Sequence, residues 1–195
     1  MGRYVGELGT DVFGITLDEV KRGRVVWTAA QAVAESTLHA AVTGSGTVVV
    51  NTTTAFTQPS CPRNLKITPG GTTADVKAAS VTVYGTNIAD EVISEAFAFA
   101  ENATAATVGA KAFKSITSMS IPAQDGAGAT FLLASGSKLG LPVKLDKNYA
   151  SDALFGTAKD SALPTMAVSS SALESNTALF ATALDGTALQ LILDL

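Results

Sequence analysis

The feature that most constrains this chain is a series of short runs rich in Val and Ile between Gln58 and Leu145, separated by Gly, Thr, Asn and Asp. Within the runs apolar and polar residues alternate, as where Val81 and Val83 stand between Ser80, Thr82 and Tyr84. Alternation places every second side chain on the same face of a strand. Regularly spaced short strands of this kind predict an all-β fold, an antiparallel β-sandwich or a barrel-like domain.

Two later runs have the same two-residue period. The first, residues 91–99, is predicted to place Ile93, Phe97 and Phe99 on one face, with Glu95 as the one polar residue there. The second, residues 113–121, is predicted to place Phe113, Thr117, Met119 and Ile121 on one face. Both runs therefore predict strands that cover a core on one side.

Two hairpins are predicted from turn residues. The first joins a strand at residues 37–42 to one at 47–51 through Gly44-Ser45-Gly46. The alanines of residues 31–43 also suit a helix, but no sustained helical stripe of apolar residues accompanies them, so the hairpin is favoured. The second joins the apolar runs on either side of Asp185-Gly186, because this dipeptide favours a type I′ turn. In the run that follows, Leu189, Leu191, Leu193 and Leu195 share one predicted face.

The two ends of the predicted domain differ from its middle. Residues 1–30 contain scattered glycines and are predicted to form an extended N-terminal arm, with a short strand at Arg24–Trp27. Residues 31–195 are predicted to form the β-sandwich domain, and residues 147–176 a polar loop or insertion within it. An arm of this kind packs along its own domain or reaches another subunit.

Composition argues against several classes of function. The net charge is −4, whereas nucleic acids and anionic membranes attract basic proteins. No run reaches the roughly 20 apolar residues of a membrane span, and no secretory signal is visible at residues 1–14. Charged residues make up only 15% of the chain, which favours a surface covered by neighbouring subunits.

Residues suited to catalysis or metal binding are few. His39 is the single histidine and Cys61 the single cysteine, so a metal site built on either residue type is not expected. Glu91 and Glu95 would share a strand face about 13 Å apart, too far for a pair of hydrolytic carboxylates. We therefore expect neither an enzyme nor a bound cofactor or metal.

Several segments resemble a family of small β-rich virion proteins encoded among the head and tail genes of tailed bacteriophages and prophages. The matching segments are PSCPRNLKI (59–67), VTVYGTN (81–87), EVISEAF (91–97), VGAKAFKSITSMSIP (108–122) and GSKLGLP (136–142), preceded by HAAVT (39–43) and followed by the closing DGT and its apolar run. Together they cover somewhat over half of the chain. The arm and the segment 147–176 are not part of the family pattern.

The resemblance implies a structural virion protein, foremost a capsid decoration protein that binds and stabilises the shell of major capsid protein. Its partners would be that capsid protein and neighbouring copies of itself, and its location the virion, assembled in the bacterial host cytoplasm. The alternatives are a tail, neck or baseplate component and, from another class, a carbohydrate-binding sandwich. The residues expected to contact partners are Tyr4, Val5, Leu8, Phe13, Ile15 and Trp27.

Overall fold

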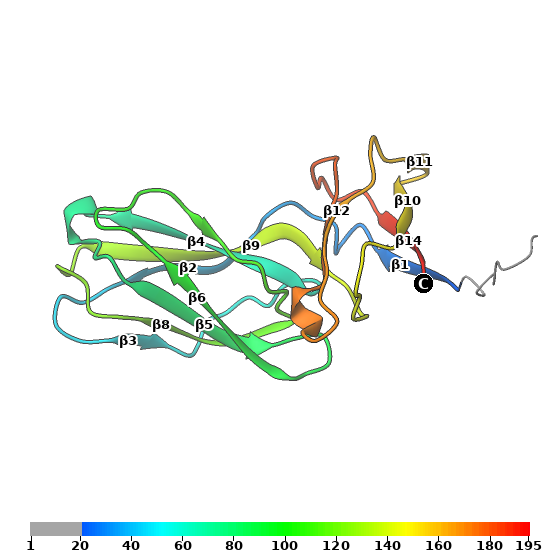
Figure 1. The fold of residues 1–195 in the computed structure, drawn as a ribbon. Coiled ribbons are helices and arrows are strands. Elements are labelled where there is room, and N and C mark those ends of the chain that lie inside the picture. The colour runs from blue at the N-terminus through cyan, green and yellow to red at the C-terminus, as the bar shows by residue number, and fades with distance from the viewer. Residues whose placement is uncertain (1–20) are drawn as a thin grey trace, which may run out of the picture.

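The computed structural model describes residues 21–195, and the regular secondary structure of this part consists almost entirely of antiparallel strands, which confirms the predicted all-β class (Figure 1). The strands are β1 (Arg22–Trp27), β2 (Thr37–Thr43), β3 (Val50–Thr52), β4 (Arg63–Gly71), β5 (Ser80–Thr86), β6 (Val92–Ala98), β7 (Thr107–Val108), β8 (Ser115–Ile121), β9 (Ala129–Gly140), β10 (Ala150–Phe155), β11 (Ala158–Lys159), β12 (Thr165–Ala167), β13 (Thr177–Leu179) and β14 (Leu189–Asp194). Two single-turn 3₁₀ helices, η1 (Thr73–Asp75) and η2 (Leu173–Ser175), interrupt them.

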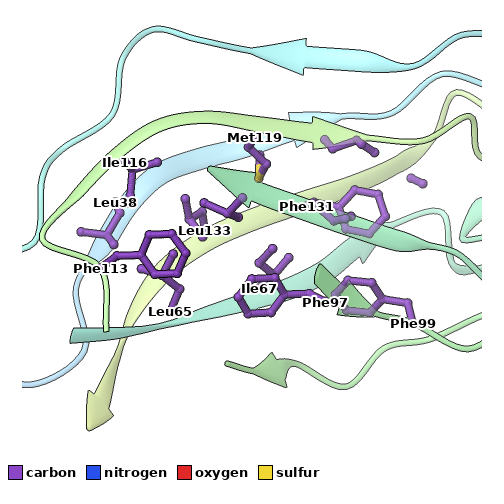
Figure 2. Close-up of a cluster of buried hydrophobic side chains, with 14 of the residues drawn as sticks. Leu38, Leu65, Ile67, Phe97, Phe99, Phe113, Ile116, Met119, Phe131 and Leu133 are labelled. Carbon is purple, nitrogen blue, oxygen red and sulfur yellow. The ribbon is translucent and has the colours of Figure 1, made fainter. Parts of the chain in front are cut away.

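Two sheets form a sandwich. One has the order β3-β8-β5-β6, and the other has the order β12-β13-β9-β4-β7, with β2 also paired to β9. Their inner faces enclose the larger core, whose side chains interdigitate between the layers (Figure 2). Leu65, Ile67 and Val83 are fully buried there. Burying each such side chain contributes about 1.5–3 kcal/mol to the stability of the fold. The burial of the apolar side chains that alternate along the strands is therefore the main driving force for folding.

A third sheet, in the order β1-β14-β10-β11, lies at one end of the sandwich and has its own core (Figure 1). Leu189, Leu191 and Leu193 of β14 point into this smaller core, as their spacing predicts, whereas Leu195 is exposed. Trp27 and Phe180 meet there edge to face, with ring centroids 5.6 Å apart. The chain therefore folds around two cores rather than one sandwich.

Strand β9 connects the two cores. It is twelve residues long; most of it pairs with β4 inside the sandwich, and its last two residues pair with β13. Leu133 of β9 belongs to the larger core and Leu139 to the smaller one. One continuous strand thus contributes side chains to both cores.

Both predicted hairpins are wrong. Strand β2 pairs with β9 and β3 pairs with β8, so the two strands lie in opposite layers of the sandwich. The run after Asp185-Gly186 forms β14, which pairs with β1 and β10 rather than with the strand before it. Gly186 has a positive φ of 93° but Asp185 does not, so a type I′ turn is not formed.

The predicted boundaries at residues 30 and 147–176 also change. Residues 22–27 form β1, a regular strand paired along its whole length with β14, and so belong to the folded body rather than to an arm. The segment predicted as a loop at 147–176 contains β10, β11, β12 and η2. Apolar residues recur irregularly in this segment because its strands are short and cover a small core. Few positions in each of these strands need to be apolar.

Candidate functional site

The most distinctive surface of the described residues is the outer face of the β3-β8-β5-β6 sheet. Because side chains alternate along each strand, the residues opposite the core point outward there. None of these outward side chains carries a charge. We call this set the neutral face: Asn51, Ser80, Thr82, Tyr84, Thr86, Val92, Ser94, Ala96, Ala98, Ser118 and Ser120.

Tyr84 stands near the middle of the neutral face. Its cross-strand neighbours are Ser94 on β6 and Ser118 on β8, both small residues. The Tyr84 side chain is therefore not enclosed, and the residue is 41% exposed. A rigid aromatic ring with a polar hydroxyl, set among small polar groups, is the kind of residue that dominates binding energy at protein interfaces.

Charged groups lie at the borders of the neutral face. Lys114 forms an ion pair with Asp90 at 2.8 Å, next to the strand ends. Lys111 donates to the backbone carbonyl of Ser94 at 3.0 Å from the β6 edge. This distribution, with a centre free of charge and a charged rim, matches the anatomy of stable protein–protein interfaces.

Of the residues predicted to contact partners, Trp27 alone lies within residues 21–195, and it is not part of the neutral face. Tyr4, Val5, Leu8, Phe13 and Ile15 fall outside the described residues. Trp27 is 3% exposed and packs in the smaller core, so the prediction that it contacts a partner is wrong. Its burial follows from its position as the last residue of β1, where its side chain points inward against Phe180.

Sequence reasoning placed Tyr84 on a strand but did not select it as a contact residue. The signal was present in the run Ser80–Thr86, because every residue alternating with the buried valines is uncharged. The adjacent strand repeats it with Ser94, Ala96 and Ala98. What the sequence lacked was the strand order, which places these two sets side by side.

The residues with potential chemistry make structural contacts. His39 Nδ1 lies 2.7 Å from the carbonyl oxygen of Ala40, and its ring packs on Phe56. Glu91 accepts a hydrogen bond from the Asn87 side chain. Glu95 accepts backbone N–H bonds from Ala110 and Lys111, which accounts for a carboxylate on an apolar strand face. Within residues 21–195 no three His, Cys, Asp or Glu side chains gather closely enough to hold a metal ion.

A cavity of about 310 Å³ lies beside the smaller core. Its walls are mainly apolar and come from the segment Leu179–Leu184, with Ala34 and Ser137 opposite. Glu35 is its only charged wall residue, and that carboxylate is already paired with Lys66. The cavity is thus suited to an apolar side chain and offers no free charge for a polar ligand.

The chain matches no protein-family model, and no curated protein or solved structure shows significant similarity to it. None of the helices in residues 21–195 has the length and apolar character needed to cross a membrane.

Proposed function

We propose that this protein is a structural subunit of a tailed-bacteriophage virion that binds the capsid shell as a decoration protein. The observation that carries the proposal is the neutral face with Tyr84 near its centre. It adds to the sequence resemblance to small virion proteins, which covers segments on β4, β5, β6, β8 and β9. In this proposal the neutral face is the surface applied to the major capsid protein.

Binding through this face would stabilise the shell by repetition. An interface of ordinary size buries about 800 Å² on each partner. A symmetric shell repeats the contact at every equivalent position, so modest individual affinities combine into a large total resistance to internal pressure. A face of small uncharged residues suits this role, because few charged groups must be stripped of water when it is covered.

A tail, neck or baseplate subunit is the second candidate, and one observation favours it. Strand β1 leaves one edge unpaired among residues 21–195. Open edges allow subunits to join by strand addition, which is how rings and tubes of β-rich subunits can form. In this role copy number would be low, because a few rings need far fewer subunits than a shell.

A carbohydrate-binding sandwich receives less support. Such a module needs several aromatic rings exposed on one face to stack on sugars. In residues 21–195 Tyr84 is the one aromatic residue that is exposed rather than buried or half-buried, and it is 41% exposed. Trp27 and Phe180, which could otherwise contribute, are buried in the smaller core.

The test is the copy number of this protein in purified particles of the phage or prophage that encodes it, measured against the major capsid protein. A ratio between about one third and one is expected for decoration at a repeated symmetric position. A few copies per particle would place the protein in the neck or tail. Its absence from particles would refute both virion roles.

A variant pair assigns the contact surface. Tyr84→Lys places a charge near the centre of the neutral face and is expected to lower the copy number at least about tenfold. The matched control is Val108→Lys, because Val108 is 54% exposed on β7, in the other sheet of the sandwich. If Tyr84→Lys particles keep the full copy number, the neutral face is not the surface that contacts the capsid.

A further inference from the structure

The free edge of β1 has a defined set of unpaired backbone groups. Lys21 and Leu195 exchange both of their backbone hydrogen bonds, at 2.8 and 2.6 Å. Because hydrogen-bonded pairs alternate along an antiparallel ladder, the backbone groups of Arg22, Arg24 and Val26 must point away from β14. Within residues 21–195 no other strand pairs with this side of β1.

The other sheet edges in the described residues are protected. The edge of β6 is covered by side chains, since Lys111 donates to the Ser94 carbonyl and Thr107 to the Ala98 carbonyl. Strand β2 has two register shifts against β9, and β3, β7, β11 and β12 are only two or three residues long. Short, bulged or covered edges resist pairing with another chain. Strand β1 is therefore the one regular six-residue edge that remains open in this part of the chain.

The open edge carries positive charge. The side chains of Arg22 and Arg24 are exposed on the same face of β1 as Val26. Arg22 pairs with Asp194 at 2.9 Å, whereas Arg24 has no ion pair within the described residues. A strand added here would be favoured by an acidic residue opposite Arg24 and by apolar residues beside Val25 and Trp27 on the inner face.

The chain's own residues 15–20 have this pattern. Their sequence is Ile-Thr-Leu-Asp-Glu-Val, in which Ile15 and Leu17 alternate with Thr16 and Asp18. We propose that residues 15–20 of a second copy add to β1 as an antiparallel strand, with Asp18 opposite Arg24. This register sets Leu17 beside Val25 and Ile15 beside Trp27 on the inner face. It also places Glu19 opposite Gly23, which has no side chain.

A second copy, rather than the same chain, supplies the strand. Pairing Asp18 with Arg24 inside one chain would leave Lys21 alone as the loop, and the shortest common hairpin loop has two residues. Residues 15–22 also contain no Gly, Pro or Asn to form a turn. Between two copies the same register puts Lys21 of each chain on a two-fold axis, and each copy gives and receives one strand.

The proposed strand exchange deepens the proposed function, because it names a second copy of the chain as the partner of residues 15–20. Only the role of the dimer in the particle rests on that proposed function. The experiment uses the purified full-length chain, and its readout is mass in solution by light scattering. The expected result is a dimer of twice the chain mass. Each single reversal, Arg24→Asp or Asp18→Arg, should weaken dimerisation about tenfold, and the double reversal should restore it.

The control reversal is Lys77→Asp, because Lys77 is half exposed and lies away from β1, with only a 3.8 Å contact to Asp125. A cross-link tests the register in an Asp18→Cys, Arg24→Cys, Cys61→Ala chain. Opposed hydrogen-bonded residues lie about 5.5 Å apart between Cα atoms, within the range of a disulfide. The expected product is a covalent dimer on a non-reducing gel.

Three outcomes would overturn the inference: a monomer at all concentrations, a dimer indifferent to both reversals, or a disulfide formed within one chain. These are distinct from failure of the proposed function. If the protein dimerises as described but is absent from purified particles, the strand exchange stands and the virion role does not.

Discussion

At the residue scale, Arg63 stands out because a guanidinium is buried where the two cores meet. The residue is 1% exposed, and its Nε and Nη1 atoms donate to the carbonyls of Gly136 and Val33, each at 2.9 Å. Its backbone pairs with Phe113 of the larger core. Burial lowers the pKa of this guanidinium below its ordinary value. One side chain thus ties the sandwich to the segments that lead into the smaller core.

Replacing Arg63 is expected to be costly. Arg63→Ala leaves the Val33 and Gly136 carbonyls without their donors and should lower the free energy of unfolding by about 3 kcal/mol. The control is Arg22→Ala, since the Arg22 side chain is 71% exposed and its ion pair should be worth under about 1 kcal/mol. Urea unfolding measures both. Equal effects of the two substitutions would contradict the role given to Arg63.

Cys61 provides a prediction about pH. Burial raises the pKa of its thiol from 9.0 to about 11. As the pH rises, the unfolded state therefore loses this proton before the folded state does. The contribution of Cys61 to the stability of the folded state is complete below pH 9.0 and is lost as the pH rises to about 11. Relative to Cys61→Ala, the native protein should lose up to about 3 kcal/mol across this window.

The same burial should make Cys61 unreactive in the native protein. Thiolate is the nucleophilic form, so an aromatic disulfide reagent near neutral pH should label the native chain at least about 100-fold more slowly than the urea-unfolded chain. Equal labelling rates would show that the thiol is accessible.

At the scale of elements, sequence periodicity predicted strands well and their partners poorly. The runs that became β5 and β6 alternate without interruption, and their buried faces are the predicted ones. The hairpins failed because turn residues report only the local backbone path. Strand β14 lies next to β1, so that Asp194 pairs with Arg22 across 172 positions of sequence. Packing of the smaller core selects the pairing of β1 with β14, and no short stretch of the sequence indicates that pairing.

Strand β8 shows a second limit of the sequence. Phe113, Met119 and Ile121 are buried as predicted, but Thr117 is exposed and Ile116 takes the inner position. The cause is a register shift between Tyr84 and Gly85, where β5 pairs with β8. A bulge inserts one residue and reverses the faces on one side of it, and alternation alone does not locate it.

Gly85 should be essential to this bulge. An added Cβ atom at Gly85 would lie 1.9 Å from the carbonyl oxygen of Ser115, which is backbone and cannot rotate away. Gly85→Ala should therefore reduce the free energy of unfolding by about 3 kcal/mol. In the control, Gly70→Ala, the nearest atom is the Thr130 hydroxyl at 3.2 Å, so thermal unfolding should shift much less. A reversed order of the two effects would refute this account.

At the scale of the whole molecule, the two cores should unfold together. They share β9 and Arg63, so neither can lose its packing without disturbing the other. Trp27 is the single tryptophan and reports on the smaller core, while circular dichroism reports on all the strands. The two signals should therefore follow one transition in urea.

Core truncations make this prediction sharper. Leu65→Ala in the larger core and Leu191→Ala in the smaller one remove equally buried side chains and should each cost about 3 kcal/mol. Both variants should move the tryptophan and dichroism transitions by the same amount. A shift of the tryptophan signal alone in Leu191→Ala would show that the smaller core unfolds independently.

The two proposed contact surfaces should respond differently to salt. The neutral face has no charge to screen, so retention on particles should change little between about 0.1 and 1 M salt. Strand exchange depends on Arg24 and Asp18, and dimerisation should weaken over the same range as the screening length falls from about 10 to 3 Å. Particle retention lost at high salt would argue against an uncharged contact.

The continuity of β9 also has a mechanical consequence. Tension applied to the small sheet at one end of the molecule would travel into the sandwich through the covalent backbone, rather than through side-chain contacts alone. Inside the sandwich, β9 is flanked by β4 along most of its length, so the pull would load a row of backbone hydrogen bonds in shear. Hydrogen bonds loaded in shear break together rather than one after another. The sandwich would therefore resist extension as a unit.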